Sequence, residues 1–117
     1  MRYFALLWIL FLSVTALVAG NEAILEKWEC EAIVDMTYPF SLEFAEEGGK
    51  LTGTITGDQG TTPLTSIQFA DGKLTFEFDY PPAGGIIDFE AKVQGESING
   101  TLGNDMFIGD FSCRRPK

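Results

Sequence analysis

Apolar and polar side chains alternate along most of the chain after residue 26, with the two-residue period of β-strands. Eight runs of this kind can be traced. In chain order, the apolar or glycine positions on their inward faces are Trp28, Cys30, Ala32, Val34 and Met36; Leu42 and Phe44; Leu51, Gly53 and Ile55; Ile67 and Phe69; Leu74, Phe76 and Phe78; Ile87, Phe89, Ala91 and Val93; Ile98, Gly100 and Leu102; and Phe107, Phe111 and Cys113. No stretch after residue 20 has the period of a helix. The pattern therefore predicts an all-β protein.

Seven turn signals rich in glycine, proline, aspartate and asparagine separate these runs. They lie at 38–39, 47–49, 57–60, 71–72, 81–85, 95–96 and 103–105. Uniformly short connections between strands that each bury one face favour a meander closed on itself, which removes exposed sheet edges. We therefore predict an eight-stranded antiparallel up-and-down (meander) barrel. A two-sheet sandwich of the same strands is the alternative.

The two cysteines fit this barrel. Cys30 lies near the start of the first run and Cys113 near the end of the last, and both have inward parity. Since the first and last strands of a meander barrel pair antiparallel, these two positions meet at the same end. We predict a Cys30–Cys113 disulfide, which closes a long loop and contributes on the order of 4 kcal/mol in the chain-entropy model. Two buried free thiols are the alternative.

The first twenty residues predict the compartment. A basic start at 1–3, an apolar run at 4–19 and small residues before Asn21 are typical of a secretory signal peptide cleaved after Gly20. The apolar run is somewhat shorter than the roughly 20 residues that a membrane span needs. We expect a signal peptide at 1–20, a single domain at 21–117, and a secreted or periplasmic location.

The composition excludes several classes of partner and several kinds of catalytic or metal site. The chain has 17 acidic and 8 basic residues, and signal cleavage removes only a base, Arg2. An acidic surface repels phosphate backbones and anionic lipids, so we expect no nucleic-acid partner and no membrane contact after cleavage. The chain has no histidine, which excludes Ser-His-Asp and Cys-His arrangements and histidine metal sites.

Pairs of carboxylates are the remaining catalytic possibility, because two suitably spaced acids can hydrolyse a glycoside. Glu77 with Asp79, and Asp88 with Glu90, each lie two residues apart on one strand face. Their parity points outward into water, where no pKa shift is expected. We therefore expect no enzyme, no cofactor and no metal site.

Trp28 in the first run and an arginine after the last run resemble the pattern of calycins, the group of the lipocalins and their relatives. In that group the tryptophan plugs the barrel floor and a basic side chain stacks across it, a cation–π contact. The resemblance implies this plug for Trp28 with Arg115, which shares the parity of Cys113, rather than with Arg114. Lipocalins carry glycine two residues before this tryptophan, where the present chain has Glu26.

A second resemblance covers most of residues 26–115. The segments Gly-Lys-Leu-Thr-Gly-Thr at 49–54, Asp-Gly-Lys-Leu-Thr-Phe at 71–76 and Gly-Thr-Leu-Gly at 100–103 are similar to those of small secreted, mostly bacterial β-barrel domains. Those domains carry no assigned activity. The resemblance implies the fold and no particular function.

Alternate turns of a meander lie at alternate ends of the barrel, which predicts a loop-rich mouth opposite the cysteines. We expect a ligand to enter there, past Tyr38, Tyr80 and Met106. The predicted wall consists of Val34, Met36, Phe44, Phe78, Ile87, Phe89 and Phe107. An eight-stranded barrel holds side chains or one small ligand, and seven inward phenylalanines favour a filled interior over a cavity.

Two functional hypotheses follow. The first is a non-enzymatic module that binds a small apolar molecule at the mouth of the barrel. The second is a solid-core domain that acts as a structural or interaction protein through its acidic surface. The presence of a cavity distinguishes the two.

Overall fold

The computed structural model describes residues 21–116, and the predicted signal peptide lies outside them. Its elements are η1 (Asn21–Ala23), β1 (Glu26–Ile33), β2 (Thr37–Glu47), β3 (Lys50–Gly57), β4 (Gly60–Pro63), β5 (Thr65–Ala70), β6 (Lys73–Tyr80), η2 (Pro81–Ala83), β7 (Gly85–Gln94), β8 (Ser97–Gly103) and β9 (Ile108–Arg114). None of the helices at 21–116 is long and apolar enough to cross a membrane.

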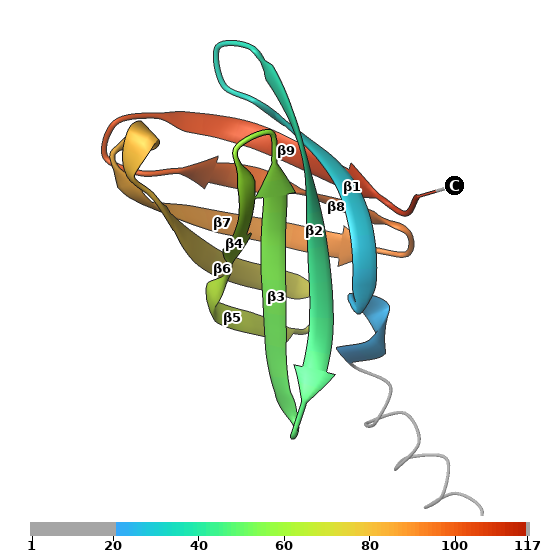
Figure 1. The fold of residues 1–117 in the computed structure, drawn as a ribbon. Helices are drawn as coiled ribbons and strands as arrows, with labels where there is room; N and C mark the ends of the chain where they lie inside the picture. Colours follow the sequence, from blue (N-terminus) through green and yellow to red (C-terminus); the bar gives the residue numbers. More distant parts are fainter. Residues whose placement is uncertain (1–20, 117) are drawn as a thin grey trace, which may run out of the picture.

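The nine strands form one antiparallel sheet in the order β4-β3-β2-β1-β9-β8-β7-β6-β5. The first and last strands, β1 and β9, pair with each other, so the sheet curls into a nearly closed up-and-down barrel. In Figure 1, β2 and β3 run upright in front, and β6, β7 and β8 cross behind them. The predicted all-β meander barrel is confirmed.

The predicted disulfide is also confirmed. Cys30 in β1 lies directly opposite Cys113 in β9, and their sulfur atoms are bonded. The bridge joins residues 83 positions apart, at the strand pair that joins β1–β4 to β5–β9 in one sheet. It therefore restrains the contact with the largest loop-closure entropy in the fold.

The strand count differs from the prediction, because the expected fourth strand divides in two at Leu64. The Leu64 side chain is buried, and its backbone N–H donates to the Gly53 carbonyl of β3 at 2.9 Å. Beyond this point Ser66 takes a left-handed conformation (φ 54°) and the register with β6 shifts. As a result β4 pairs with β3 and β5 pairs with β6, and no ladder joins β4 to β5.

The first turn also lies elsewhere than predicted. The chain reverses at residues 34–36, where the Val34 N–H donates to the Met36 carbonyl at 3.2 Å. Tyr38 and Pro39 lie within β2, opposite Ala32 and Glu31. The physical reason is that a residue before proline prefers an extended backbone, so a Tyr-Pro pair suits a strand as well as a turn.

Large side chains fill the half of the barrel around Trp28, which we call the floor end. Trp28, Leu42, Phe44, Leu74, Phe76 and Ile98 are almost completely buried there. The rings of Phe76 and Phe89 are stacked with centroids 4.6 Å apart. Gly100 allows β8 to lie close to β7, since a Cβ at that position would meet the Glu90 carbonyl and lie 2.6 Å from the Ala91 Cα.

Replacing Gly100 by alanine should destabilise the barrel by about 1–3 kcal/mol, because the added methyl forces β8 away from β7. Urea unfolding followed by circular dichroism measures the change. Gly57→Ala is the matched control, since its Cβ would meet open space and should alter stability by less than about 0.5 kcal/mol. Equal effects of the two substitutions would contradict the close approach of β8 to β7.

Candidate functional site

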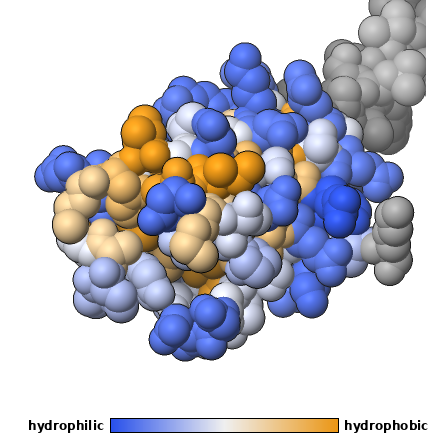
Figure 2. Space-filling model, turned by 90° about the horizontal axis from the view of Figure 1, so that it is seen from above, coloured by the Kyte–Doolittle hydropathy of each residue, from blue (hydrophilic) through white to orange (hydrophobic). Residues whose placement is uncertain are grey.

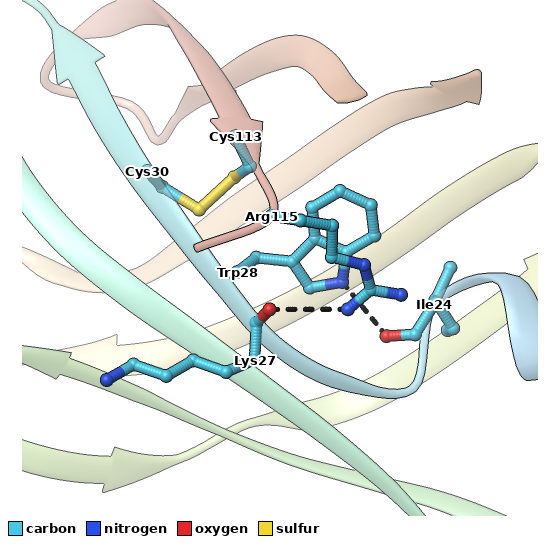
Figure 3. Close-up of a disulfide and its surroundings, with 6 residues drawn as sticks. All are labelled: Ile24, Lys27, Trp28, Cys30, Cys113 and Arg115. Carbon is cyan, nitrogen blue, oxygen red and sulfur yellow. Dashed lines mark hydrogen bonds between the residues drawn. A yellow bond between two sulfur atoms is a disulfide. The ribbon is translucent and has the colours of Figure 1, made fainter. Parts of the chain in front are cut away.

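The floor of the barrel is built around Trp28. Its indole is fully buried, and its Nε1–H donates to the Ile24 carbonyl at 3.0 Å. The Arg115 guanidinium lies over the ring, with Cζ 3.9 Å from the ring centroid. Figure 3 shows this pair beside the Cys30–Cys113 bridge, with the arginine reaching from the end of β9 across the start of β1.

Arg115 also ties the incoming chain to the floor. Its Nη1 donates to the carbonyls of Leu25 and Lys27, at 2.7 and 3.2 Å, and its Nη2 donates to the Ala23 carbonyl at 3.1 Å. Glu26, at the position where lipocalins carry glycine, has a φ of 77°. Glycine adopts that conformation without strain and other residues rarely do.

A pocket of about 560 Å³ opens at the opposite end, which we call the mouth end. The walls come from the β1–β2 hairpin, the β3–β4 turn, η2 and the turn before β9. Of the predicted entrance and wall residues, those that line it are Val34, Tyr38, Phe78, Tyr80, Ile87, Phe89, Met106 and Phe107. The interior is thus filled with side chains at the floor end and hollow at the mouth end.

Two predicted wall residues lie elsewhere. Met36 sits at the tip of the β1–β2 hairpin with 64% of its surface exposed, because the turn comes earlier in the chain than predicted. Phe44 is 1% exposed and packs below the pocket against Phe76, with ring centroids 5.8 Å apart. Neither of the two lines the pocket.

Sequence reasoning missed Phe40, which lines the pocket and packs against Phe89 with ring centroids 6.2 Å apart. Its parity matches that of Leu42 and Phe44, so the signal was present in the sequence. The interpretation of Tyr38-Pro39 as a turn concealed it. Ala32 and Ala83 also line the pocket, and their small side chains leave its volume open.

Asn104 holds one side of the mouth in place. Its side-chain Nδ2 donates to the Ala83 carbonyl of η2 at 2.9 Å, and its Oδ1 accepts from the Met106 N–H at 2.8 Å. The Asn104 backbone N–H donates to the Phe107 carbonyl at 3.0 Å. These bonds join the β8–β9 turn to η2, so Met106 and Phe107 are fixed relative to the pocket.

Two carboxylates, Asp35 and Asp58, stand among the lining residues. The Tyr38 hydroxyl donates to Asp35 Oδ1 at 2.8 Å. This hydrogen bond lowers the pKa of Asp35 below its ordinary value and raises the pKa of Tyr38. At neutral pH the rim therefore carries an ionised carboxylate and a neutral phenol.

Apolar side chains gather around the mouth. The large hydrophobic side chains that are exposed within residues 21–116 all lie at this end, and they are Ile33, Met36, Tyr38, Ile86, Met106 and Ile108. Figure 2, seen from above, shows hydrophobic side chains forming a patch surrounded by hydrophilic ones. Exposed patches of this kind typically mark a binding site or an interface.

The outward acids also form a pair, across β6 and β7 rather than along one strand. Glu77 lies opposite Asp88 in the ladder. A hydrogen bond with Asp88 raises the pKa of Glu77 above its ordinary value, and partial desolvation and the charge of Asp88 act in the same direction. The expectation that these exposed acids have ordinary pKa values was therefore wrong for Glu77.

No family model and no curated protein sequence matches this chain. Among solved structures, a redesigned β-barrel is similar, with a TM-score of 0.64 and 12% sequence identity. The match covers 84% of this chain and 96% of that barrel. At this identity the likeness concerns the barrel fold alone.

Replacing Arg115 by alanine should lower stability by about 2 kcal/mol, because charge-assisted hydrogen bonds to three carbonyls and the contact with Trp28 are lost. Urea unfolding gives the stability, and tryptophan emission of residues 21–117 reports on Trp28 and should shift to longer wavelength. Arg114→Ala removes an exposed arginine next to it and should change neither quantity. A blue emission retained in Arg115→Ala would argue against the plug.

Glu77→Gln should raise the melting temperature at pH 7. A raised pKa means that the folded protein holds this proton more tightly than the unfolded chain does. The stability from the protonated pair is thus full below the ordinary pKa of 4.5 and is lost as the pH rises through the raised value. The advantage of the glutamine variant should therefore shrink as the pH falls toward 4.5.

Glu90→Gln is the control for this experiment, because it removes an outward charge from the same sheet face but also breaks the 3.6 Å ion pair with the Lys73 ammonium. It should not raise the melting temperature at pH 7. A Glu77→Gln advantage that is absent at pH 7, or independent of pH, would refute the shared proton.

Proposed function

We propose that this chain is a secreted, non-enzymatic β-barrel that binds a small apolar molecule in the pocket at its mouth. The observation that carries the proposal is the pocket of about 560 Å³ walled by aromatic and aliphatic side chains. Binding sites for small molecules are typically concave, mostly apolar, and on the order of 300–1,000 Å³ in volume. The rim of exposed apolar side chains adds surface that a bound ligand would cover.

Secretion is supported by two features of different kinds. The first twenty residues have the pattern of a signal peptide. The Cys30–Cys113 bridge is compatible with the oxidising compartments that secreted proteins enter.

A relation to calycins is the finer form of this proposal. It is supported by the Arg115–Trp28 contact at the floor and by the positive φ of Glu26, at the glycine position of lipocalins. Such a relation implies that a ligand binds inside the barrel, and the pocket at the mouth end agrees with this position.

Catalysis is not part of the proposal. Catalytic carboxyls usually owe their altered pKa values to burial beside a reacting group. No charged or polar residue among those described is buried. The acids with shifted pKa values, Asp35 and Glu77, are both exposed to water.

The neutral fluorophore N-phenyl-1-naphthylamine tests the proposal on residues 21–117. The protein should bind it saturably, with a rise in emission. Ala83→Trp places a large ring in the pocket wall and should weaken binding by about tenfold or more, a loss of about 1.4 kcal/mol. Ala45→Trp adds the same ring to the outer face of β2 and should leave binding unchanged.

Absence of saturable binding, or equal binding by the two tryptophan variants, would overturn the proposal.

Interaction through the outer surface is the second candidate function. It is favoured by the net charge of −9 and by the exposed apolar side chains at the mouth end. An inert pocket would direct attention to protein partners of that surface.

A further inference from the structure

We propose that the ligand of the mouth pocket carries a positive charge, and that its chemical class is an apolar amine or quaternary ammonium compound. This inference rests on the proposed function and makes it more specific. Three features of the structure carry it: the charges in the pocket, the distribution of charge along the barrel, and the aromatic rings of the wall.

The pocket contains negative charge without positive charge. Asp35 lies in the β1–β2 hairpin and Asp58 in the β3–β4 turn, and both line the pocket. No lysine or arginine is among the lining residues. The Tyr38 hydroxyl donates to Asp35 and keeps its carboxylate ionised, yet it neutralises none of the charge. A bound cation would complete this arrangement.

Basic residues are confined to one end of the barrel, whereas acidic residues occur at both ends. The six lysines and arginines of residues 21–116 all lie toward the floor end: Lys27 at the start of β1, Lys50 at the start of β3, Lys73 at the start of β6, Lys92 near the end of β7, and Arg114 and Arg115 at and after the end of β9. Acids accompany these bases at the floor end, for example Glu47, Asp71 and Glu96. At the mouth end the described residues include acids in or beside the turns and no base, and the acids are Asp35, Asp58, Asp79 and Asp105.

Because the mouth end of residues 21–116 has acids and no base, it has a negative potential that extends beyond the two lining carboxylates. Such a field concentrates cations at the opening and repels anions, and a low-dielectric wall focuses it. An apolar anion such as a fatty acid would therefore enter against the field. Its carboxylate would find no basic partner among the lining residues and would lie near two groups of like charge.

Aromatic rings provide the second means of holding a cation. Tyr38, Phe40, Phe78, Tyr80, Phe89 and Phe107 all line the pocket. Ring faces attract ammonium groups, and recognition of quaternary ammonium compounds by aromatic side chains is a recurrent use of this contact. The apolar body of the ligand would lie among the inner rings, with its charged group near Asp35 and Asp58 at the opening.

Three compounds with the same alkyl chain separate charge from apolarity: decylammonium, decan-1-ol and decanoate. Each compound is titrated into the complex of N-phenyl-1-naphthylamine with residues 21–117, at neutral pH and below its micelle-forming concentration. The loss of fluorophore emission measures its binding. Decylammonium should bind about tenfold more tightly than decan-1-ol, through ion pairing and cation–π contact. Decanoate should bind more weakly than decan-1-ol. The preference for the cation should diminish in high salt.

Asp35→Asn and Asp58→Asn, separately and together, should reduce the preference for decylammonium over decan-1-ol while leaving decan-1-ol binding intact. Asp71→Asn is the matched control at the floor end, because its φ of 54° suits asparagine and it lies outside the pocket. Circular dichroism of each variant verifies folding, and the two single variants provide independent tests of the charge.

The outcomes distinguish this inference from the proposed function on which it rests. If decan-1-ol and decanoate bind as tightly as decylammonium, or the preference survives in the double variant, the inference is overturned and the proposed function stands. If neither the fluorophore nor any of the three compounds binds, both are overturned. A cation preference that is lost in Asp35→Asn and Asp58→Asn but kept in Asp71→Asn supports both.

Discussion

The pairing of β1 with β9 is the contact on which the rest of the barrel depends. Without it the strands form two separate sheets, β1–β4 and β5–β9, because no ladder joins β4 to β5. It joins the two ends of the chain, so its loop-closure cost is the largest in the fold. The Cys30–Cys113 bridge and the bonds from Arg115 to the carbonyls of residues 23–27 both lie at this junction. The bridge and these bonds therefore offset the loop-closure cost at the strand pair where that cost is largest.

Closure at this register also sets the unequal filling of the interior. Trp28 lies at the floor end of β1, where Leu42 is its partner in β2, and both side chains are completely buried. Farther along the same strand, Ala32 lies opposite Tyr38, and the chain then turns outward at 34–36. Small side chains and an early turn leave the upper interior open. The pocket therefore exists because the strands carry too little side-chain volume at the mouth end to fill the interior.

Charge and exposed apolar surface are distributed along the same axis. Basic residues lie toward the floor end, where Arg115 stacks on Trp28 and Lys73 lies near Glu90. Exposed apolar side chains and the carboxylates Asp35 and Asp58 lie at the mouth end. This combination supports a small apolar cation as the ligand of the pocket.

The sequence by itself determined the strand alternation, the meander, the disulfide and most of the pocket wall, because side-chain parity in a strand follows directly from residue number. The same parity indicated Phe40, but a local turn interpretation of Tyr38-Pro39 concealed it and displaced Met36 into the wall. Only the tertiary structure decided the division of β4 from β5 at Leu64, the Glu77–Asp88 contact and the hollow upper interior. These features depend on how distant strands approach one another and on the volume left between them, and neither quantity is encoded in a local pattern.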